Sequence, residues 1–459
     1  MTRVKMNNLG IPPLAGVCSY EEACKVGIDV DRNVSLLRRY LYIQTQLNKI
    51  FAAHLASTPE WEVKCAFSLH MWLAAEHSAI LRKRVTEMRE PPLHLDKVPD
   101  LQLEKLFQEL IRSDGTSELV VGIYGVVMTE FVAALKLHLD ETNPLVDHPT
   151  YRILKIIRME QEEMLAWGKQ AIVGLTPSSE IQLKTQKWAD HLAVFLDNAG
   201  GISGEANKII LDNKVAPRND GQPYEMQMEP KRDERFIDIY NDSVKIDSFY
   251  GDADLEPDER TYALLYKRLR EMDVPEWMGP IIYRTNGKPW DYYVDMSRQL
   301  WDEARHSMLG EVGLYQDGVE FYKYPIEYKT SMTLNKAFTA LEAHTILWYI
   351  EQSLMPKETG KRYEWVVAME SDNALAKTFQ DYDWADEVLH AQIGRKWLVP
   401  EHGSLEEMKN QGALISQRYS IERAKLDVHS EQLVNWWPQF LAEIREGRDK
   451  IRGKQLQPK

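Results

Sequence analysis

Apolar residues recur with the period of an α-helix through most of this 459-residue chain, and prolines and glycines interrupt the pattern. In the N-terminal part the pattern predicts four long helices. Asp31 or Asn33 can cap the first helix, and prolines follow the ends of the first three. The expected ranges are 31–57, 60–89, 117–141 and 150–173. Long helices joined by mostly short connections predict a four-helix bundle.

The helical pattern returns after residue 256 and predicts a second set of four helices. The expected ranges are 258–285, 289–315, 328–355 and 371–397. Pro275 and Pro280 should kink the first of these helices. The remaining residues, 404–455, are highly charged and predict a further long helix or hairpin that serves packing or oligomerisation.

Between the two sets the pattern becomes irregular. Glycines, prolines and the short runs KIILDNKV and RFIDIYNDSVKI predict loops with a little strand. The fold class is therefore all-α, with two four-helix bundles joined by an irregular, partly β linker and followed by a long C-terminal helix. The expected divisions are an irregular segment at 1–30, a first bundle at 31–175, a linker at 176–256, a second bundle at 257–400 and a helical extension at 401–459.

Two copies of a DExxH motif stand out in the second set, DEARH at Asp302–His306 and DEVLH at Asp386–His390. Residues three apart share one helix face, so each motif places a carboxylate beside an imidazole. Two such helices, with one glutamate from each of two more, form the metal cage of a dimetal four-helix bundle. Glu303, His306, Glu387 and His390 are therefore candidate metal ligands.

The aspartate that leads each motif has a predicted role of its own. A metal-bound histidine usually donates its other ring N–H to a carboxylate, which fixes its tautomer and orientation. Asp302 is expected to serve His390, and Asp386 to serve His306, each across to the opposite helix.

The other two helices of the second bundle must each supply a carboxylate. Ligands on two antiparallel helices should be equidistant from the turn between them. Glu271 lies sixteen residues before Gly287 and Glu303 sixteen after it, which favours Glu271, with Glu276 as the alternative. On the third helix Glu342 is favoured and Glu351 is the alternative.

Four carboxylates and two imidazoles carry four negative charges and balance two divalent cations. Hard oxygen ligands combined with nitrogen ligands suit iron or manganese. The expected cofactor is two Fe ions, with Mn or a mixed Fe/Mn pair as the alternatives.

The motifs resemble those of the ferritin-like diiron-carboxylate superfamily, in which paired DExxH motifs are the signature. DEARH is similar to the D-E-x-R-H form of its oxygen-activating monooxygenases. The longer runs DEARHSMLGEVGL and DEVLHAQIGRKWL resemble an uncharacterised ferritin-like family related to a diiron tRNA-modifying hydroxylase. The resemblance implies two ferritin-like bundles and a diiron hydroxylase or oxidase that needs a small-molecule substrate and an electron donor. The alternatives are an iron-binding ferroxidase without an organic substrate and a metal-poor helical scaffold.

The two sets of helices look like copies of one another. LAAEHSAILRKRV, which contains Glu76, aligns with LWDEARHSMLGEV, which contains Glu303. The first bundle lacks both motif histidines, and the candidates for a second site there are Glu76, Glu130, Glu160 and Glu163. His77 should point away from the side of the helix that carries Glu76. A degenerate structural copy is the favoured interpretation.

Composition limits the partners and the compartment. The net charge of −14 makes a nucleic-acid partner unlikely. Three cysteines (Cys18, Cys24 and Cys65) predict no disulfide framework and no zinc site. No apolar run approaches the ~18 residues of a membrane span, so a cytoplasmic protein without a membrane partner is expected. A homodimer is compatible with the sequence.

Overall fold

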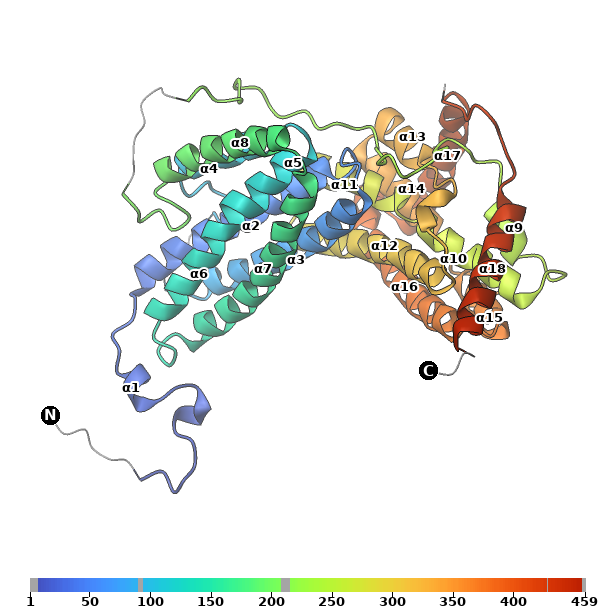
Figure 1. Ribbon diagram of the computed structural model, residues 1–459. Helices are drawn as coiled ribbons and strands as arrows, with labels where there is room; N and C mark the ends of the chain where they lie inside the picture. The colour runs from blue at the N-terminus through green and yellow to red at the C-terminus, as the bar shows by residue number, and fades with distance from the viewer. Residues whose placement is uncertain (1–6, 90–93, 208–214, 427, 456–459) are drawn as a thin grey trace. The chain divides into compact units, whose positions relative to one another are not determined.

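The computed structural model describes residues 7–89, 94–207, 215–426 and 428–455. These ranges contain helices and no strand, which confirms the all-α class. The chain divides into two compact units (Figure 1). Unit 1 comprises Met1–Asn48 and Leu73–Tyr224, and unit 2 comprises Lys49–Trp72 and Glu225–Lys459. The division falls within two helices, α2 (Val30–His54) and α3 (Trp61–Thr86), so their C-terminal and N-terminal parts respectively belong to unit 2.

Unit 1 is built around long helices close to the predicted ranges. After η1 (Leu14–Gly16) and α1 (Tyr20–Ala23) come α2 and α3, then α4 (Leu101–Leu110), a continuous run of α5 (Gly115–Val120), η2 (Val121–Met128) and α6 (Thr129–Glu141), then α7 (His148–Leu175) and α8 (Ser179–Asn198). The ring centroids of Tyr40 and Phe131 are 5.4 Å apart where α2 packs on α6. On α7, a Cβ at Gly168 would lie 2.2 Å from the Tyr124 ring, so η2 and α7 approach at a glycine.

Two helices of unit 1 were not predicted. Asp100 caps α4 by accepting bonds from the amides of Gln102 and Leu103, and Ser178 caps α8 in the same way through Ile181. The predicted linker at 176–256 is therefore wrong at its start, because α8 occupies Ser179–Asn198. The strand content predicted for RFIDIYNDSVKI is also wrong, since no strand forms there. The run KIILDNKV lies almost wholly in 208–214, outside the described residues.

The prediction that no segment has the length and apolar character of a membrane span is wrong for the run from α5 to α6. Gly115–Glu141 is the one helix in the described part of the chain that is long and apolar enough to cross a membrane. Its most apolar window is 67% buried in the protein. Such burial is also typical of the central helix of a folded domain.

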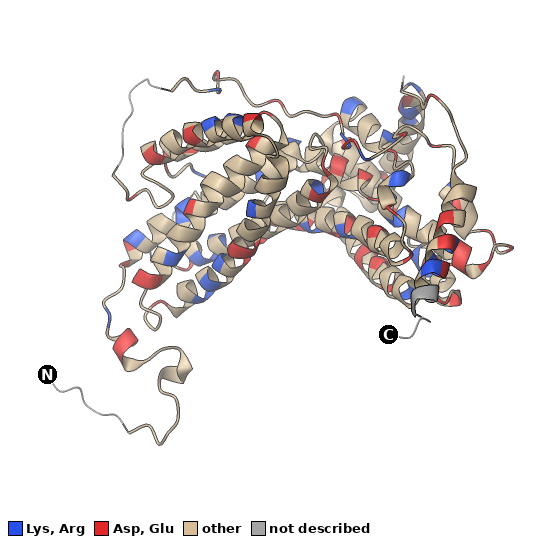
Figure 2. Cartoon of the chain, in the orientation of Figure 1, with Lys and Arg blue, Asp and Glu red and all other residues tan. Residues whose placement is uncertain are grey.

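Unit 2 holds the remaining helices, whose packing forms a closed series. They are α9 (Ile246–Tyr250), α10 (Pro257–Arg270), α11 (Asp273–Arg284), α12 (Trp290–Gln316), η3 (Phe321–Lys323), α13 (Lys329–Ala337), α14 (Ala340–Ser353), α15 (Lys361–Glu370), α16 (Ala374–His402), α17 (Leu405–Ala424) and α18 (Trp437–Gln455). Helices α10 and α11 pack on α12, α12 on α16, α16 on α14, and α14 on α11. Acidic and basic residues are interspersed along these helices (Figure 2).

Two of the helices predicted for unit 2 are each broken in two. The helix is not kinked at Pro275 as predicted, but is interrupted before this residue, between α10 and α11. Pro275 therefore lies in the first turn of α11, where no amide donor is needed. Pro280 inside α11 has no amide hydrogen and cannot donate to the Glu276 carbonyl. The side-chain amide of Asn335 donates to that carbonyl instead, at 3.1 Å. Phe338 is extended and separates α13 from α14.

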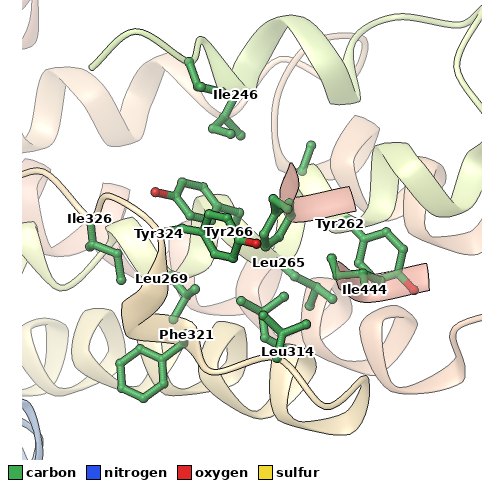
Figure 3. Packing of buried hydrophobic residues seen from close by; sticks show 14 of the residues in the cluster. Ile246, Tyr262, Leu265, Tyr266, Leu269, Leu314, Phe321, Tyr324, Ile326 and Ile444 are labelled. Carbon is green, nitrogen blue, oxygen red and sulfur yellow. The ribbon is translucent and has the colours of Figure 1, made fainter. Parts of the chain in front are cut away.

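The C-terminal extension forms two helices and completes the core of unit 2. Figure 3 shows Ile444 of α18 near Leu265 of α10 and Leu314 of α12. Trp436 packs against Tyr266 with the rings tilted by 45° and their centroids 4.6 Å apart. The C-terminal segment therefore contributes to packing within unit 2, which is one of the two roles predicted for it.

Helix α12 approaches α10 so closely that a side chain has no room. A Cβ at Gly310 would lie 2.6 Å from both the Leu265 carbonyl oxygen and the Leu269 amide nitrogen. We expect Gly310→Ala to destabilise the protein by about 1–3 kcal/mol, because the helices must move apart. Gly174→Ala, at a helical position of α7 with no atom within 4 Å of the added Cβ, should instead stabilise by up to about 1 kcal/mol. Thermal unfolding of both variants measures the difference, and an unchanged melting temperature for Gly310→Ala would contradict the packing described.

Candidate metal centre

Four helical segments of unit 2 bring carboxylates and imidazoles together in its interior. Glu271 is the C-cap of α10. Helix α12 contributes Glu303 and His306, α14 contributes Glu351, and α16 contributes Asp383, Glu387 and His390. On α12 and α16 the three-residue spacing of each motif places Glu and His on one face.

These side chains form two groups that share one residue. The Glu271 cluster consists of Glu271, His306, Asp383 and Glu387, and the Glu351 cluster consists of Glu303, Glu351, Glu387 and His390. Within each group the candidate ligand atoms all lie within 4.8 Å of one another. Glu387 belongs to both, so the clusters adjoin. Buried acidic and histidine groups of this kind could hold metal ions.

Several atoms in the clusters that could bind a metal lack hydrogen-bond partners. They are the Nδ1 atoms of His306 and His390 and the Oε2 atoms of Glu271 and Glu387. The His306 Nδ1 atom lies 3.5 Å from Glu271 Oε2 and 3.4 Å from Asp383 Oδ1. A buried polar atom without a partner costs about 1–3 kcal/mol. One cation in each cluster would give these atoms a partner, so the residues fit a pair of metal ions.

The other nitrogen of each imidazole faces an aspartate of the opposite helix. His306 Nε2 lies 3.1 Å from Asp386 Oδ2, and His390 Nε2 lies 3.4 Å from Asp302 Oδ2. Both crossed pairs expected from the motifs are therefore present. Arg305 donates to Asp302 at 2.7 Å and to Asp386 at 2.6 Å, which links the two aspartates and offsets part of their charge.

The charges around the centre shift the acid–base behaviour of its members. Burial acts to raise the pKa of Asp302, but the His390 hydrogen bond and the Arg305 and Arg298 charges lower it to about 2. For Glu271, burial again acts to raise the pKa, while Arg268 and Lys361 lower it to about 2. Burial and the neighbouring Glu387 charge raise the pKa of Glu351 well above its usual range.

Glu342, the favoured carboxylate of the third helix, lies outside both clusters. Its carboxylate accepts a 2.9 Å bond from the Thr339 amide, while the Thr339 hydroxyl accepts from the Glu342 amide, so the pair forms a capping box at the start of α14. Arg418 also donates to Glu342. The alternative, Glu351, is the residue that joins the clusters. The equidistance argument failed here because α15 lies between α14 and α16, so no simple turn joins them.

Glu276, the alternative to Glu271, is also outside the clusters. It is fully buried and pairs with the side chains of Lys64 and Arg232. Glu271 reaches the cluster because α10 ends there, before α11 begins.

Two residues near the centre were missed in the sequence. Asp383 lies four residues before Glu387 on α16, and this helical spacing could have identified it. Lys361, at the start of α15, places its Nζ atom 2.7 Å from Glu387 Oε1 and 3.0 Å from Asp383 Oδ1. No local pattern marks Lys361, because its position depends on how α15 packs on α10 and α16.

The candidate second site in unit 1 is not assembled. Glu130 and Glu163 are exposed and Glu76 is half-buried. Glu160 instead approaches His77, whose Nε2 atom lies 2.5 Å from Glu160 Oε2, so the expectation for His77 missed this contact. Among the described residues, both groups suited to a metal lie in unit 2.

No protein-family model, curated protein or solved structure matches this chain. The ferritin-like resemblance of the motifs remains a prediction.

The two glutamates of α14 offer a matched test of the centre. Glu351→Gln should weaken metal binding by more than the ~10–100-fold loss that follows removal of an outer-shell partner, because it removes a direct donor. Glu342→Gln should leave metal content unchanged, since that carboxylate caps the helix. Metal analysis after equilibrium dialysis measures both. Metal loss from the Glu342 variant alone would contradict the arrangement described.

Unit 1 provides a second test. The double change Glu160→Gln and Glu163→Gln should leave metal content unaltered, because these side chains converge on no metal-binding group. The corresponding change in unit 2, Glu387→Gln with His390→Gln, should remove metal from both clusters. Equal losses from the two double variants, measured by elemental analysis, would show a site in unit 1.

Proposed function

We propose that this protein is a metal-dependent oxidoreductase, a hydroxylase or oxidase that uses dioxygen, with two Fe ions, Mn ions or a mixed pair in unit 2. The proposal is supported above all by the convergence of unpartnered Nδ1 and carboxylate oxygen atoms on two adjoining positions. Glu271, His306 and Asp383 would hold one metal and Glu303, Glu351 and His390 the other. Glu387 would bridge the two.

The donor set favours iron or manganese. Each position offers carboxylate oxygens and one imidazole nitrogen, a hard set that includes no thiolate. The buried cysteine, Cys65, belongs to the hydrophobic core of unit 2. Iron bound in this donor set would supply the electrons for dioxygen reduction.

The chain's own residues prepare the centre in three ways. Asp302 and Asp386 orient the imidazoles so that each Nδ1 atom faces its cluster. Arg305 and Arg298 offset the aspartate charges at one edge. The ligand side chains other than that of Glu271, which is 13% exposed, are buried, and this burial strengthens the charge interactions in the centre.

The proposal extends to the architecture. We regard the two units as ferritin-like bundles that arose by duplication, with the metal centre retained in unit 2. The placement of DEARH on α12 and DEVLH on α16, two helices in contact, supports the ferritin-like view of unit 2. The proposed duplication rests on the alignment of LAAEHSAILRKRV with LWDEARHSMLGEV. A cytoplasmic location, a small-molecule substrate and a separate electron donor belong to the same proposal.

Oxygen consumption tests the proposal directly. Anaerobic protein loaded with Fe(II) should consume dioxygen when mixed with aerated buffer and oxidise its iron, because the clustered donors favour the oxidised metal. An oxygen electrode and a colorimetric Fe(II) assay follow the two changes. Glu303→Ala and His390→Ala should reduce the initial rate to that of free Fe(II) in buffer. Iron-loaded wild-type protein that oxidises no faster than free Fe(II) would refute the oxidoreductase proposal.

A further inference from the structure

A buried lysine occupies the Glu271 cluster. The Nζ atom of Lys361 lies 2.7 Å from Glu387 Oε1, 3.0 and 3.1 Å from the two oxygens of Asp383, and 3.5 Å from Glu271 Oε1. The side chain has no exposure to solvent. One ammonium therefore contacts all three carboxylates of a group that would otherwise bind a metal.

The backbone holds Lys361 in this position. The Lys361 amide donates to the Leu354 carbonyl at 3.0 Å, and the Gly360 amide donates to the Pro356 carbonyl at 2.9 Å. A Cβ at Gly360 would lie 1.9 Å from the Leu354 carbonyl oxygen, so this tight connection requires glycine. The lysine thus enters the cluster from the first residue of α15, with its backbone fixed.

A second cation contacts carboxylates of the same cluster. Arg268 of α10 lies 3.0 Å from Glu271 Oε1 and also donates to Asp383. Its guanidinium is fully buried and also reaches Glu364, at 3.1 Å. Two positive groups therefore already offset part of the negative charge of the three carboxylates in the Glu271 cluster.

Glu303 and Glu351, the two carboxylates that belong to the Glu351 cluster alone, contact no such cation among the described residues. Glu351 accepts a 3.2 Å hydrogen bond from the neutral amide of Gln299. Among the residues that the structure describes, no lysine or arginine forms an ion pair with Glu303 or Glu351. Lys361 touches this cluster only through the shared Glu387.

We infer that Lys361 competes with a metal ion for the Glu271 cluster, so that the two metal positions fill in order, the Glu351 cluster first and tightly and the Glu271 cluster second and weakly. A metal entering the Glu271 cluster must displace the ammonium or bear its repulsion at a distance of a few ångströms, where burial weakens dielectric screening. This inference rests on the proposed metal centre and adds an order and a regulating residue to it.

Titration with Mn(II) tests the order. Metal-free full-length protein is titrated, and free Mn(II) is counted by its electron paramagnetic resonance signal. Wild-type protein should bind one equivalent tightly and a second about tenfold more weakly, or weaker still. Lys361→Met, which keeps the aliphatic stem and removes the charge, should tighten the second equivalent about tenfold or more and leave the first nearly unchanged.

Lys267→Met is the matched control. Lys267 is a half-buried lysine of unit 2, and it pairs with Glu364, which belongs to neither cluster. Its loss should leave both binding constants unchanged. If it alters them as Lys361→Met does, a general loss of positive charge would explain the effect and the inference would be wrong.

Two ligand variants test the assignment with Lys361 in place. Asp383→Asn should abolish only the weak equivalent, whereas Glu351→Gln should abolish the tight one. Two equal sites in the wild type, or unchanged binding by a folded Lys361→Met variant, would overturn the ordered filling and leave the oxidoreductase proposal standing. A wild-type protein that binds neither Mn(II) nor Fe(II) would overturn both.

Discussion

Repulsion among buried carboxylates is the constraint on which the interior of unit 2 depends. Five carboxylates lie close enough together to share metal ions, and all but that of Glu271 are buried. They are Glu271, Glu303, Glu351, Asp383 and Glu387. Such a concentration of negative charge is tolerable only when cations or protons offset it. The surrounding chain supplies part of this compensation through Arg268 and Lys361, and the unpartnered donor atoms show where it is incomplete.

The same constraint explains why neighbouring elements are needed around the metal centre. Helix α15 appears in no simple four-helix plan, yet it delivers Lys361 to the Glu271 cluster and Glu364 to Arg268. On the opposite edge, Arg305 links the two aspartates that orient the imidazoles. Positive charge is thus placed in two positions. Lys361 and Arg268 contact the carboxylates of the Glu271 cluster, and Arg305 contacts the two aspartates that orient the histidines.

Local spacing predicted the part of the centre that a single helix determines. The Glu and His of each motif share a face because a helix requires it, and Glu271 followed from its distance to the turn at Gly287. The same reasoning misplaced the third carboxylate because a hairpin was assumed where α15 intervenes. The sequence Thr339-Ala-Leu-Glu342 already had the form of a capping box, a local signal that assigns Glu342 another role. Lys361 had no signal of this kind, since its neighbours come from distant parts of the chain. In the fold, the all-α class followed from periodicity. The way α11 accommodates Pro280 could not be predicted in this way, because it depends on a tertiary bond from the Asn335 side chain to the Glu276 carbonyl.

The glycine at position 310 connects the packing of unit 2 to the chemistry of its interior. It lies one helical turn after His306, and the α10 backbone that it touches at Leu269 is two residues from Glu271. The separation of α10 and α12 at this point therefore sets the width of the gap between the Glu271 and His306 donor atoms, now 3.5 Å. A single methyl group at position 310 would push α10 and α12 apart and lengthen the distance between the Glu271 and His306 donor atoms. Selectivity between smaller and larger cations could thus evolve at a residue that never touches the metal.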